Sequence, residues 1–325
     1  MDDLAIQKQK AKVASLSIIS NSVLVVFKAV IGILIGSVSV FSEAIHSGMD
    51  LIAAVIAFLA VRISGRQADE GHPFGHAKVE DISALAEALL IFVAAGWIIY
   101  EAIHKLIVPR PLEMPALGVM VMFISSAANF MVSQRLFHVG KQTDSPALLA
   151  NGWHLRTDVY TSLGVMVGLG LILLGRYVFP GVNISWIDPV MAITVAVMIL
   201  RAAYHLASSA VQDLLDKSTS SEEKAWIQNY LYNLYPTVRS FHKLRTRKAG
   251  DARFVDLHIA VHAQMTVSDS HHVADQIMAD FRTHFPHIDV ILHIEPCDGS
   301  CSSACTSGCL LSAEERTEAV TKGSK

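Results

Sequence analysis

The chain has 325 residues, of which 52% are hydrophobic and 17% are charged, and its formal net charge is -3. Soluble domains carry about a quarter charged residues, so the composition excludes a wholly soluble protein. The small net charge provides no basic surface, and we expect no nucleic-acid partner. The mean hydropathy of +0.42 comes from apolar runs between Val13 and Leu206, and the remainder has the composition of a soluble domain.

Residues 1–12 are polar, and the apolar run behind them is too long for a signal peptide. We therefore predict that this run is a membrane helix. A helix that crosses the hydrocarbon core needs about 20 mostly apolar residues. Six segments between breakers such as Gly71–Gly75, Pro109–Pro111 and Pro180–Gly181 satisfy this: Val13–Ile35, Val38–Ile63, Ile82–Ile107, Ala116–Phe137, Ala147–Tyr177 and Ile184–Ala207.

Six spans place both termini on one side of the membrane. If that side is cytoplasmic, the outer loops carry three basic residues: Lys105, Arg110 and Arg176. The inner segments then carry eight: Lys8, Lys10, Lys12, Arg62, Arg66, Lys78, Arg135 and Lys141. This distribution obeys the positive-inside rule, so both termini are predicted to be cytosolic.

After a six-helix domain at residues 13–210, the pattern becomes that of a soluble domain at 211–297. Helical patterns cover Thr219–Tyr235 and Ser268–His284, and alternating patterns predict strands at Ser240–Lys248, Arg253–His262 and Asp289–Ile294. The order αββαβ predicts a small α+β domain with an antiparallel sheet and helices on one face. We expect residues 298–325, which are rich in Cys, Ser and Gly, to lack fixed structure without a ligand.

Two of the predicted spans carry the same pair of ionisable residues, a His followed by an Asp four positions later. These pairs are His46 with Asp50 and His154 with Asp158. Residues four apart share one helix face, and ionisable groups within a span are costly and usually functional. Two such helices side by side would supply four ligands, a number that suits a tetrahedral ion.

Two carboxylates and two neutral imidazoles carry a charge of -2, which a divalent cation neutralises. Protons compete with that cation, because both ligand types bind metal only when deprotonated. The mixed nitrogen and oxygen set favours Zn²⁺ over Mg²⁺, Ca²⁺ or Cu(I). The alternative is that these polar residues only join helices. We interpret four isolated polar residues as helix–helix contacts, snorkelling groups or cavity lining: Asn21, Lys28, Glu87 and Asn129. Arg156 is expected to point away from the ligand face.

The loop between the second and third segments contains Asp69, His72 and His76. These are ligand-type residues at close spacing, which favours a metal site. The alternative is a solvated turn around Pro73 and Gly75.

Several motifs in order resemble the cation diffusion facilitator family, and in particular its bacterial dimeric zinc/proton antiporters. The resemblance runs from about Lys12 to Cys297. It rests on Gly36-Ser-Val-Ser-Val, Asp69-Glu-Gly-His72-Pro-Phe-Gly-His76-Ala-Lys78, His242-Lys-Leu-Arg-Thr-Arg247, His271-His-Val-Ala-Asp-Gln276 and His293-Ile-Glu295-Pro-Cys297.

This resemblance implies six spans, a ferredoxin-like cytosolic metal-binding domain and a homodimer in a bacterial inner membrane. It implies export of a divalent metal driven by protons, with His46, Asp50, His154 and Asp158 as the transport site. Asp69, His72 and His76 fall on a second family site. A two-metal cluster at the dimer interface falls on His242, His258, His271, His293 and Glu295. Lys78 and Asp216 match a charge interlock between subunits.

Two residues depart from the family pattern. Many bacterial relatives have Asp at the position of His46, and the His favours Zn²⁺ and weakens the case for Cd²⁺, Fe²⁺ or Mn²⁺. The alternative substrates within the family are Cd²⁺, Fe²⁺, Mn²⁺, Co²⁺ and Ni²⁺. The family usually has Asp where this chain has Glu295, and the longer side chain of Glu changes how the carboxylate can bridge two metal ions. Periodicity does not decide between His258 and His262, while His262, His272, His284 and His287 are expected at the surface.

The four cysteines, at positions 297, 301, 305 and 309, recur every fourth residue and are not a family feature. No disulfide framework is implied, and a reducing, cytoplasmic location is expected. The thiols are either a metal-capture site or a dispensable, oxidisable tail.

We therefore predict a zinc exporter that exchanges metal for protons by alternating access. The rival classes are a metal-gated channel, which would conduct without coupling, and a membrane metal sensor, which would not need paired ligands within the spans. The sequence shows neither a nucleotide-binding loop nor a set of nucleophile and base, so nothing in it favours an enzyme.

Overall fold

The computed structural model describes residues 3–35, 38–108, 116–178, 186–299 and 301–323. The chain forms two compact units, a helical unit from Asp2 to Leu214 and a C-terminal unit from Leu215 to Lys325. Gly36, Pro109–Pro111 with Arg110, Pro180–Gly181 and the predicted helix start at Ile184 lie outside the described residues.

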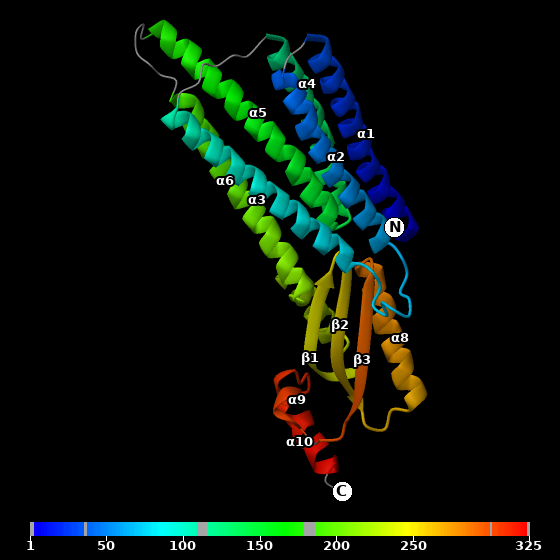
Figure 1. Cartoon of the computed structure of the whole chain (residues 1–325). Helices are drawn as coiled ribbons and strands as arrows, with labels where there is room; N and C mark the ends of the chain where they lie inside the picture. Colours follow the sequence, from blue (N-terminus) through cyan, green and yellow to red (C-terminus); the bar gives the residue numbers. More distant parts are fainter. Residues whose placement is uncertain (1–2, 36–37, 109–115, 179–185, 300, 324–325) are drawn as a thin grey trace. The chain divides into compact units, whose positions relative to one another are not determined.

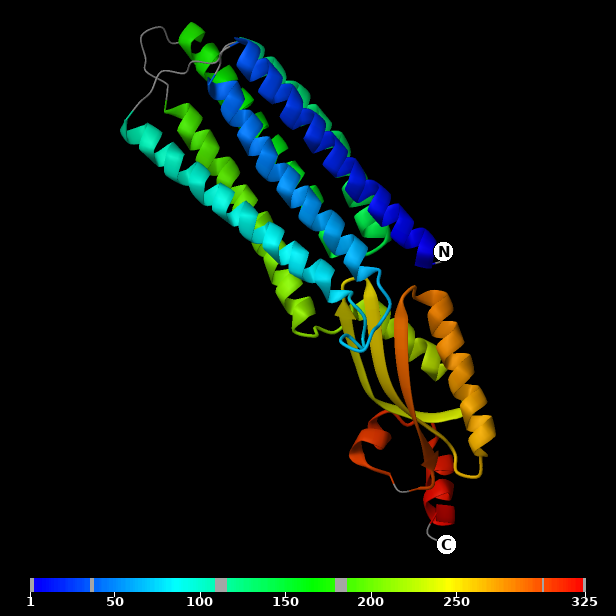
Figure 2. The same cartoon turned by 45° about the vertical axis from the view of Figure 1, so that its right-hand side comes forward.

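The helical unit consists of six long helices in its described part (Figures 1 and 2). In pairs that pack closely, α1 lies against α2, α3 against α6 and α4 against α5. Their bounds are α1 Asp3–Ile35, α2 Val38–Ser64, α3 Lys78–Ile107, α4 Ala116–Gln142, α5 Pro146–Val178 and α6 Ile187–Leu214.

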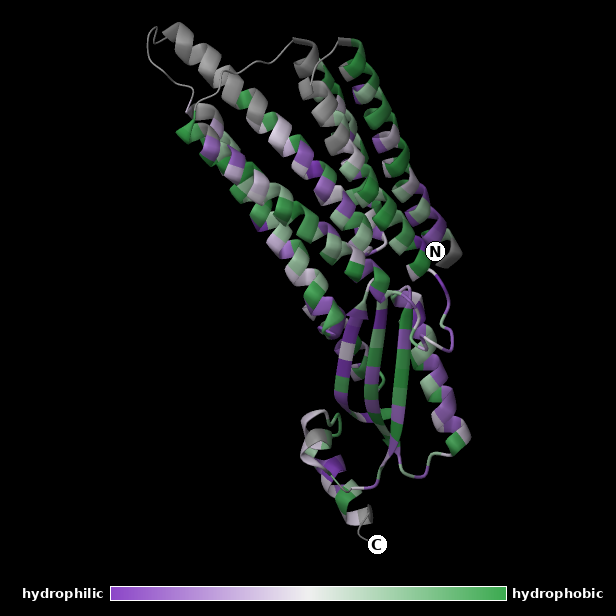
Figure 3. Cartoon of the chain, in the orientation of Figure 1, coloured by the Kyte–Doolittle hydropathy of each residue, from purple (hydrophilic) through white to green (hydrophobic). Residues whose placement is uncertain are grey.

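The helices are predominantly apolar (Figure 3), and large side chains such as Ile19, Val23 and Val26 on α1 are exposed. Within the described residues, α1, α2, α3 and α6 are long and apolar enough to span a membrane. Four helices extend beyond the predicted apolar segments, at the starts of α1 and α3 and at the ends of α4 and α6. No proline interrupts these polar extensions, so the helical hydrogen bonds continue.

A fully buried polar network joins four helices of this unit. Lys10 of α1 forms an ion pair with Glu80 of α3, and both side chains are 0% exposed. Ser64 of α2 donates to the Glu80 carboxylate at 2.8 Å, and Ser145, directly before α5, donates to its other oxygen. A buried charge is tolerated only when it is paired and hydrogen-bonded, so this network fixes how the four helix ends meet.

The C-terminal unit has the predicted order of helices and strands, with β1–β2–β3 as the order in its sheet. The prediction of a fully antiparallel sheet is wrong, because β2 pairs with β1 antiparallel and with β3 parallel. A parallel neighbour requires a crossover connection, which α8 supplies. The bounds are α7 Ser221–Tyr232, β1 Val238–Ala249, β2 Ala252–His262, α8 Val267–His284 and β3 Ile288–Cys297.

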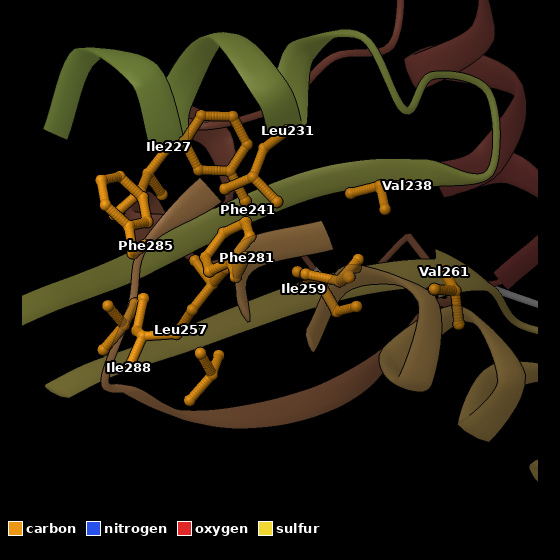
Figure 4. Close-up of a cluster of buried hydrophobic side chains, with 13 residues drawn as sticks. Ile227, Leu231, Val238, Phe241, Leu257, Ile259, Val261, Phe281, Phe285 and Ile288 are labelled. Carbon is orange, nitrogen blue, oxygen red and sulfur yellow. The ribbon is translucent and has the colours of Figure 1, made fainter. Parts of the chain in front are cut away.

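The core of this unit lies between one face of the sheet and the two helices α7 and α8 (Figure 4). Phe281 of α8, which is 0% exposed, lies among Ile227 and Leu231 of α7 and Leu257 and Ile259 of β2. Successive strand residues point to opposite faces. Residues that alternate with Leu257 and Ile259 therefore project from the other face of the sheet.

The segment after Cys297 is folded, in contrast to the predicted irregular tail. It contains the helices α9 (Ser303–Ser307) and α10 (Ala313–Gly323). Between them, the chain pairs with the free edge of β1, where the amide of Phe241 donates to the carbonyl of Gly308 at 3.1 Å. A Cβ atom at Gly308 would lie 1.7 Å from the Phe241 carbonyl oxygen, so only glycine permits this approach.

Replacing Lys10 tests the buried network. Lys10→Met removes the ammonium group from beside a buried carboxylate, and we expect a loss of about 3–5 kcal/mol of stability. The double variant Lys10→Met/Glu80→Gln also removes the negative charge and should recover most of that loss. Thermal unfolding of the detergent-solubilised protein measures both effects, with the exposed Lys12→Met as the matched control. A double variant no more stable than the single one would contradict the pairing.

Candidate metal centres

Three groups of His and acidic side chains that could each hold one ion occur in the described part of the chain. Within each group the ligand atoms lie within 4.8 Å of one another. We call them the helix site (Asp50, His154, Asp158), the loop site (Asp69, His72, His76) and the sheet site (His242, His258, Glu295). Every one of these residues was in the predicted ligand set.

The helix site joins α2 and α5, as the paired spacing predicted. The imidazole Nε2 of His154 lies 3.2 Å from Oδ1 of Asp50, and Asp158 lies one helical turn after His154. Asp50 is 3% exposed. His46 belongs to α2, one turn before Asp50, and its side chain lies outside the described residues. The structure therefore brings together three of the four predicted ligands.

Polar residues of α1 border this site. Asn21 donates to the backbone carbonyl of Asp50 at 3.4 Å, and Lys28 donates to Ser47 of α2 at 2.8 Å. Both contacts join α1 to α2, in line with their interpretation as helix–helix contacts. Arg156 lies over the rings of Phe130 and Phe137 of α4, with its guanidinium carbon 4.5 and 5.5 Å from the ring centres.

Glu87 of α3 is a functional candidate that the sequence analysis treated as a helix contact. Its side chain is fully buried, and neither carboxylate oxygen has a hydrogen-bond partner among the described residues. It interacts electrostatically with His154. An unpaired carboxylate is costly in a low-dielectric interior, so Glu87 either holds a proton or pairs with positive charge at the helix site. In the sequence, the feature that could have identified Glu87 as a functional candidate was its position as an acidic residue within an apolar span.

The loop site lies between α2 and α3 and is centred on one carboxylate. Oδ1 of Asp69 accepts from the backbone amide of His72 at 2.7 Å, and Oδ2 lies 3.3 Å from Nε2 of His76. The His72 backbone hydrogen bond, together with the two imidazoles, lowers the pKa of Asp69. The two imidazole rings lie 4.4 Å apart. The turn and the ligand cluster therefore coexist, although they were alternatives in the sequence analysis.

The sheet site is built by strand register. His242 of β1 lies opposite His258 of β2, which lies opposite His293 of β3. The three imidazoles form a row on the face opposite α7 and α8, since His258 alternates with the core residues Leu257 and Ile259. The register therefore places His258, and not His262, in the sheet site. The Nδ1 of His262 accepts a hydrogen bond from the amide of Gln264 at the strand end.

Glu295 connects this row. Its carboxylate lies 3.2 Å from Nε2 of His242, 2.7 Å from Nδ1 of His258 and 3.6 Å from Nε2 of His293. The hydrogen bond from His258 and the charges of the neighbouring imidazoles lower the pKa of Glu295. Burial lowers the pKa of His242. Both shifts keep the groups deprotonated, which is the state that metal ligation requires.

A bulge in β1 aligns the row. His242 pairs with His258 and Arg245 pairs with Asp256, so β1 has one more residue than β2 across this interval. Lys243 absorbs the extra residue in the left-handed conformation, with φ of +51°. Such a bulge redirects side chains locally, and here it brings His242 opposite His258.

Other predicted residues lie apart from these groups. His271, on α8, is 3.6 Å from Asp275 and does not belong to the sheet site as described. His287 is half-buried and pairs with Asp251 at 2.9 Å, so its interpretation as a surface residue is wrong. Lys78 donates to the carbonyl of Leu214, and Asp216 pairs with Arg247 at 3.2 Å.

Two family models match nearly the whole chain. The model described as the cation efflux transmembrane domain matches residues 14–215, which cover most of α1 and all of α2 to α6. The chain belongs to the cation diffusion facilitator family. A second model, described as the cation efflux protein cytoplasmic domain, matches residues 219–297. Members of this family are divalent-cation efflux transporters of the membrane, and the second domain is one through which they dimerise.

Curated relatives match over most of their length. The chain is 34% identical over 261 residues to an uncharacterized transporter of Synechocystis sp., covering 80% of this chain and 82% of the relative. It is 32% identical to the cation-efflux pump FieF of Citrobacter koseri, covering 81% and 84%. Among solved structures, the metal-bound C-terminal domain of the CzcD transporter from Thermotoga maritima is 26% identical, with a TM-score of 0.22, over 24% of this chain and 94% of that one.

The lowered pKa of His242 has a consequence for stability in the metal-free protein. In the unfolded chain this imidazole takes up a proton near pH 6.5, whereas in the folded chain it resists protonation. The free energy of unfolding should therefore fall as the pH drops below about 6.5, by at most about 1.4 kcal/mol per pH unit.

Urea unfolding of the C-terminal unit, followed by the fluorescence of Trp226 in a protein with the other three tryptophans replaced by Phe, measures this slope. His242→Gln removes the titrating group and should flatten the slope between about pH 7 and about pH 5.5. The exposed His272→Gln is the control. Equal slopes in all three proteins would contradict the assignment.

Proposed function

We propose that this protein exports Zn²⁺ from the cytosol in exchange for protons, and that the helix site is the transport site. The grouping of Asp50, His154 and Asp158, from two helices of a membrane unit, carries this proposal. His46 completes the set as the fourth ligand, one turn before Asp50 on the same helix. Two imidazoles and two carboxylates are a tetrahedral set suited to Zn²⁺.

Charge balance supplies the coupling. Asp50 and Asp158 together carry a charge of -2, and Zn²⁺ neutralises it. In the absence of metal, the close approach of His154 and Asp50 provides a position for a proton between them. Metal and protons therefore occupy the same groups in turn, and each helps to release the other as the site faces alternate sides of the membrane.

The two further centres support the same function from the cytosolic side. We place both termini in the cytosol, since the basic residues then accumulate there. The loop site and the sheet site would then meet metal that has accumulated in the cell. In the sheet site the buried Nδ1 of His242 has no partner within the described residues, and its Nε2 faces Glu295. This donor set fits Zn²⁺ as a resident ion that stabilises the homodimer.

A metal-gated channel is the second candidate, because it would use the same ligands. It would conduct zinc without regard to an imposed proton gradient. The interaction of Glu87 and the paired His–Asp groups around one position favours a site at which charges are exchanged rather than a conducting path.

Removal of a ligand tests the transport site. His154→Ala or Asp158→Ala should lower proton-driven zinc flux in sealed vesicles by roughly 100-fold or more, since even the loss of a ligand's outer partner costs 10–100-fold in affinity. Val159→Ala, on the same helix, is the matched control and should transport normally. Intact, pH-driven flux in either ligand variant would refute the assignment. Flux in the unmodified protein that ignores the proton gradient would support the channel.

Metal preference depends on the residue at position 46. His46→Asp replaces a nitrogen ligand by a harder oxygen ligand, and we expect the ratio of zinc to cadmium transport to change by about tenfold or more. Competition between Zn²⁺ and Cd²⁺ in the same vesicles measures that ratio. His138→Asp, which changes a histidine of α4 outside the three sites, is the control. An unchanged ratio in His46→Asp would remove the main argument for zinc.

A further inference from the structure

The four cysteines gather at one end of the C-terminal unit, although the family relationship assigns them no role. Cys297 is the last residue of β3, and Cys305 lies in α9. The backbone of Cys309 forms an isolated antiparallel β-bridge with Ser240 of β1. Cys301 lies between the strand and α9. One of the thiols is exposed, the other three are half-buried, and none forms a disulfide.

Contacts that do not involve sulfur hold this segment in place. The amide of Leu310 donates to the carbonyl of Arg239 at 2.8 Å, and its side chain packs against the core of the unit. The Tyr235 hydroxyl donates to Glu315 of α10. A Cβ atom at Gly299, which has φ of +85°, would lie 2.5 Å from the carbonyl oxygen of Ala319. These contacts therefore hold the cysteine-bearing segment at this end of the unit independently of any bond between the thiols.

The thiols also affect one another. Cys297 and Cys301 each interact electrostatically with Cys305 and Cys309. Cys305 lies against β1, with its Sγ 3.5 Å from the hydroxyl of Ser240, and that hydroxyl donates to the Cys305 carbonyl at 2.9 Å.

Two arginines border the cysteines. Arg239 interacts electrostatically with Cys297, and Arg316 with Cys301. Four thiolates around one divalent cation carry a net charge of -2, and two guanidinium groups offset it. Arginines beside cysteines also favour the thiolate form, which is the form that binds metal.

We propose that Cys297, Cys301, Cys305 and Cys309 form a four-thiolate site that binds Zn²⁺, a borderline d¹⁰ cation. This site is separate from the three His and carboxylate sites. Binding releases the thiol protons, and the cation accepts four Zn–S bonds in a tetrahedral arrangement. The four sulfur atoms are not among the described groups whose ligand atoms lie within 4.8 Å of one another, so metal binding would bring the sulfur atoms closer together.

Thiolate ligation has a spectroscopic signature that His and carboxylate sites lack. The full-length reduced protein, titrated with Co²⁺, should develop near-ultraviolet sulfur-to-cobalt charge transfer, and Zn²⁺ should abolish it. In the protein with all four cysteines changed to Ser, this absorption should be absent and the protein should bind about one metal ion fewer per chain. Ser303→Ala, in the same segment, is the matched control and should behave as the unmodified protein.

Cys301→Ser distinguishes a loss of metal binding from a folding defect. Its side chain is exposed and forms none of the contacts that hold the segment, so the variant should fold normally. It should weaken Zn²⁺ competition against Co²⁺ by about tenfold or more. Absence of the charge-transfer band from the reduced, unmodified protein would overturn the proposal, as would cysteines that remain open to alkylation at saturating Zn²⁺. The readout is binding, so it is independent of zinc transport by the helix site.

Discussion

The cost of an uncompensated charge in a low-dielectric interior determines how the helical unit is arranged. Lys10 and Glu80 are both completely buried, and neither is tolerable without the other. The pair, with Ser64 and Ser145, joins helices α1, α2, α3 and the start of α5. The same constraint acts at the helix site, where Asp50 faces His154. Charge compensation therefore determines both how the helix ends meet and where an ion binds.

In the C-terminal unit, strand register has the role that charge compensation has among the helices. The core needs Leu257 and Ile259 on one face, so His258 must project from the other. Its neighbours on both sides are histidines because β1 and β3 pair with β2 at those positions. Apolar burial thus positions the polar ligands of the sheet site, although those ligands add nothing to the core.

The sequence predicted features whose informative spacing lies within one element or between neighbouring elements. The pair of His154 and Asp158 on one helix and the αββαβ order are of this kind. It was not sufficient where the partner lies far along the chain. Alternation predicts β3 but not that it runs parallel to β2, and it does not separate His258 from His262. Glu87 has no local partner to reveal it, and docking of the tail depends on Gly308 meeting Phe241 across 67 positions of sequence.

The β1 bulge relates the length of the chain at this point to the position of His242. The pairs from Arg245 to Ala249 share one register, and extending that register without a bulge would put Lys243 opposite His258. Loss of one residue between His242 and Arg245 would therefore remove the bulge and leave His242 opposite His258, whereas loss of the bulge at unchanged chain length would put Lys243 there instead. A chain of this length thus needs the left-handed residue at Lys243 for the three-histidine row, whereas a chain one residue shorter here would form the same row on a regular ladder.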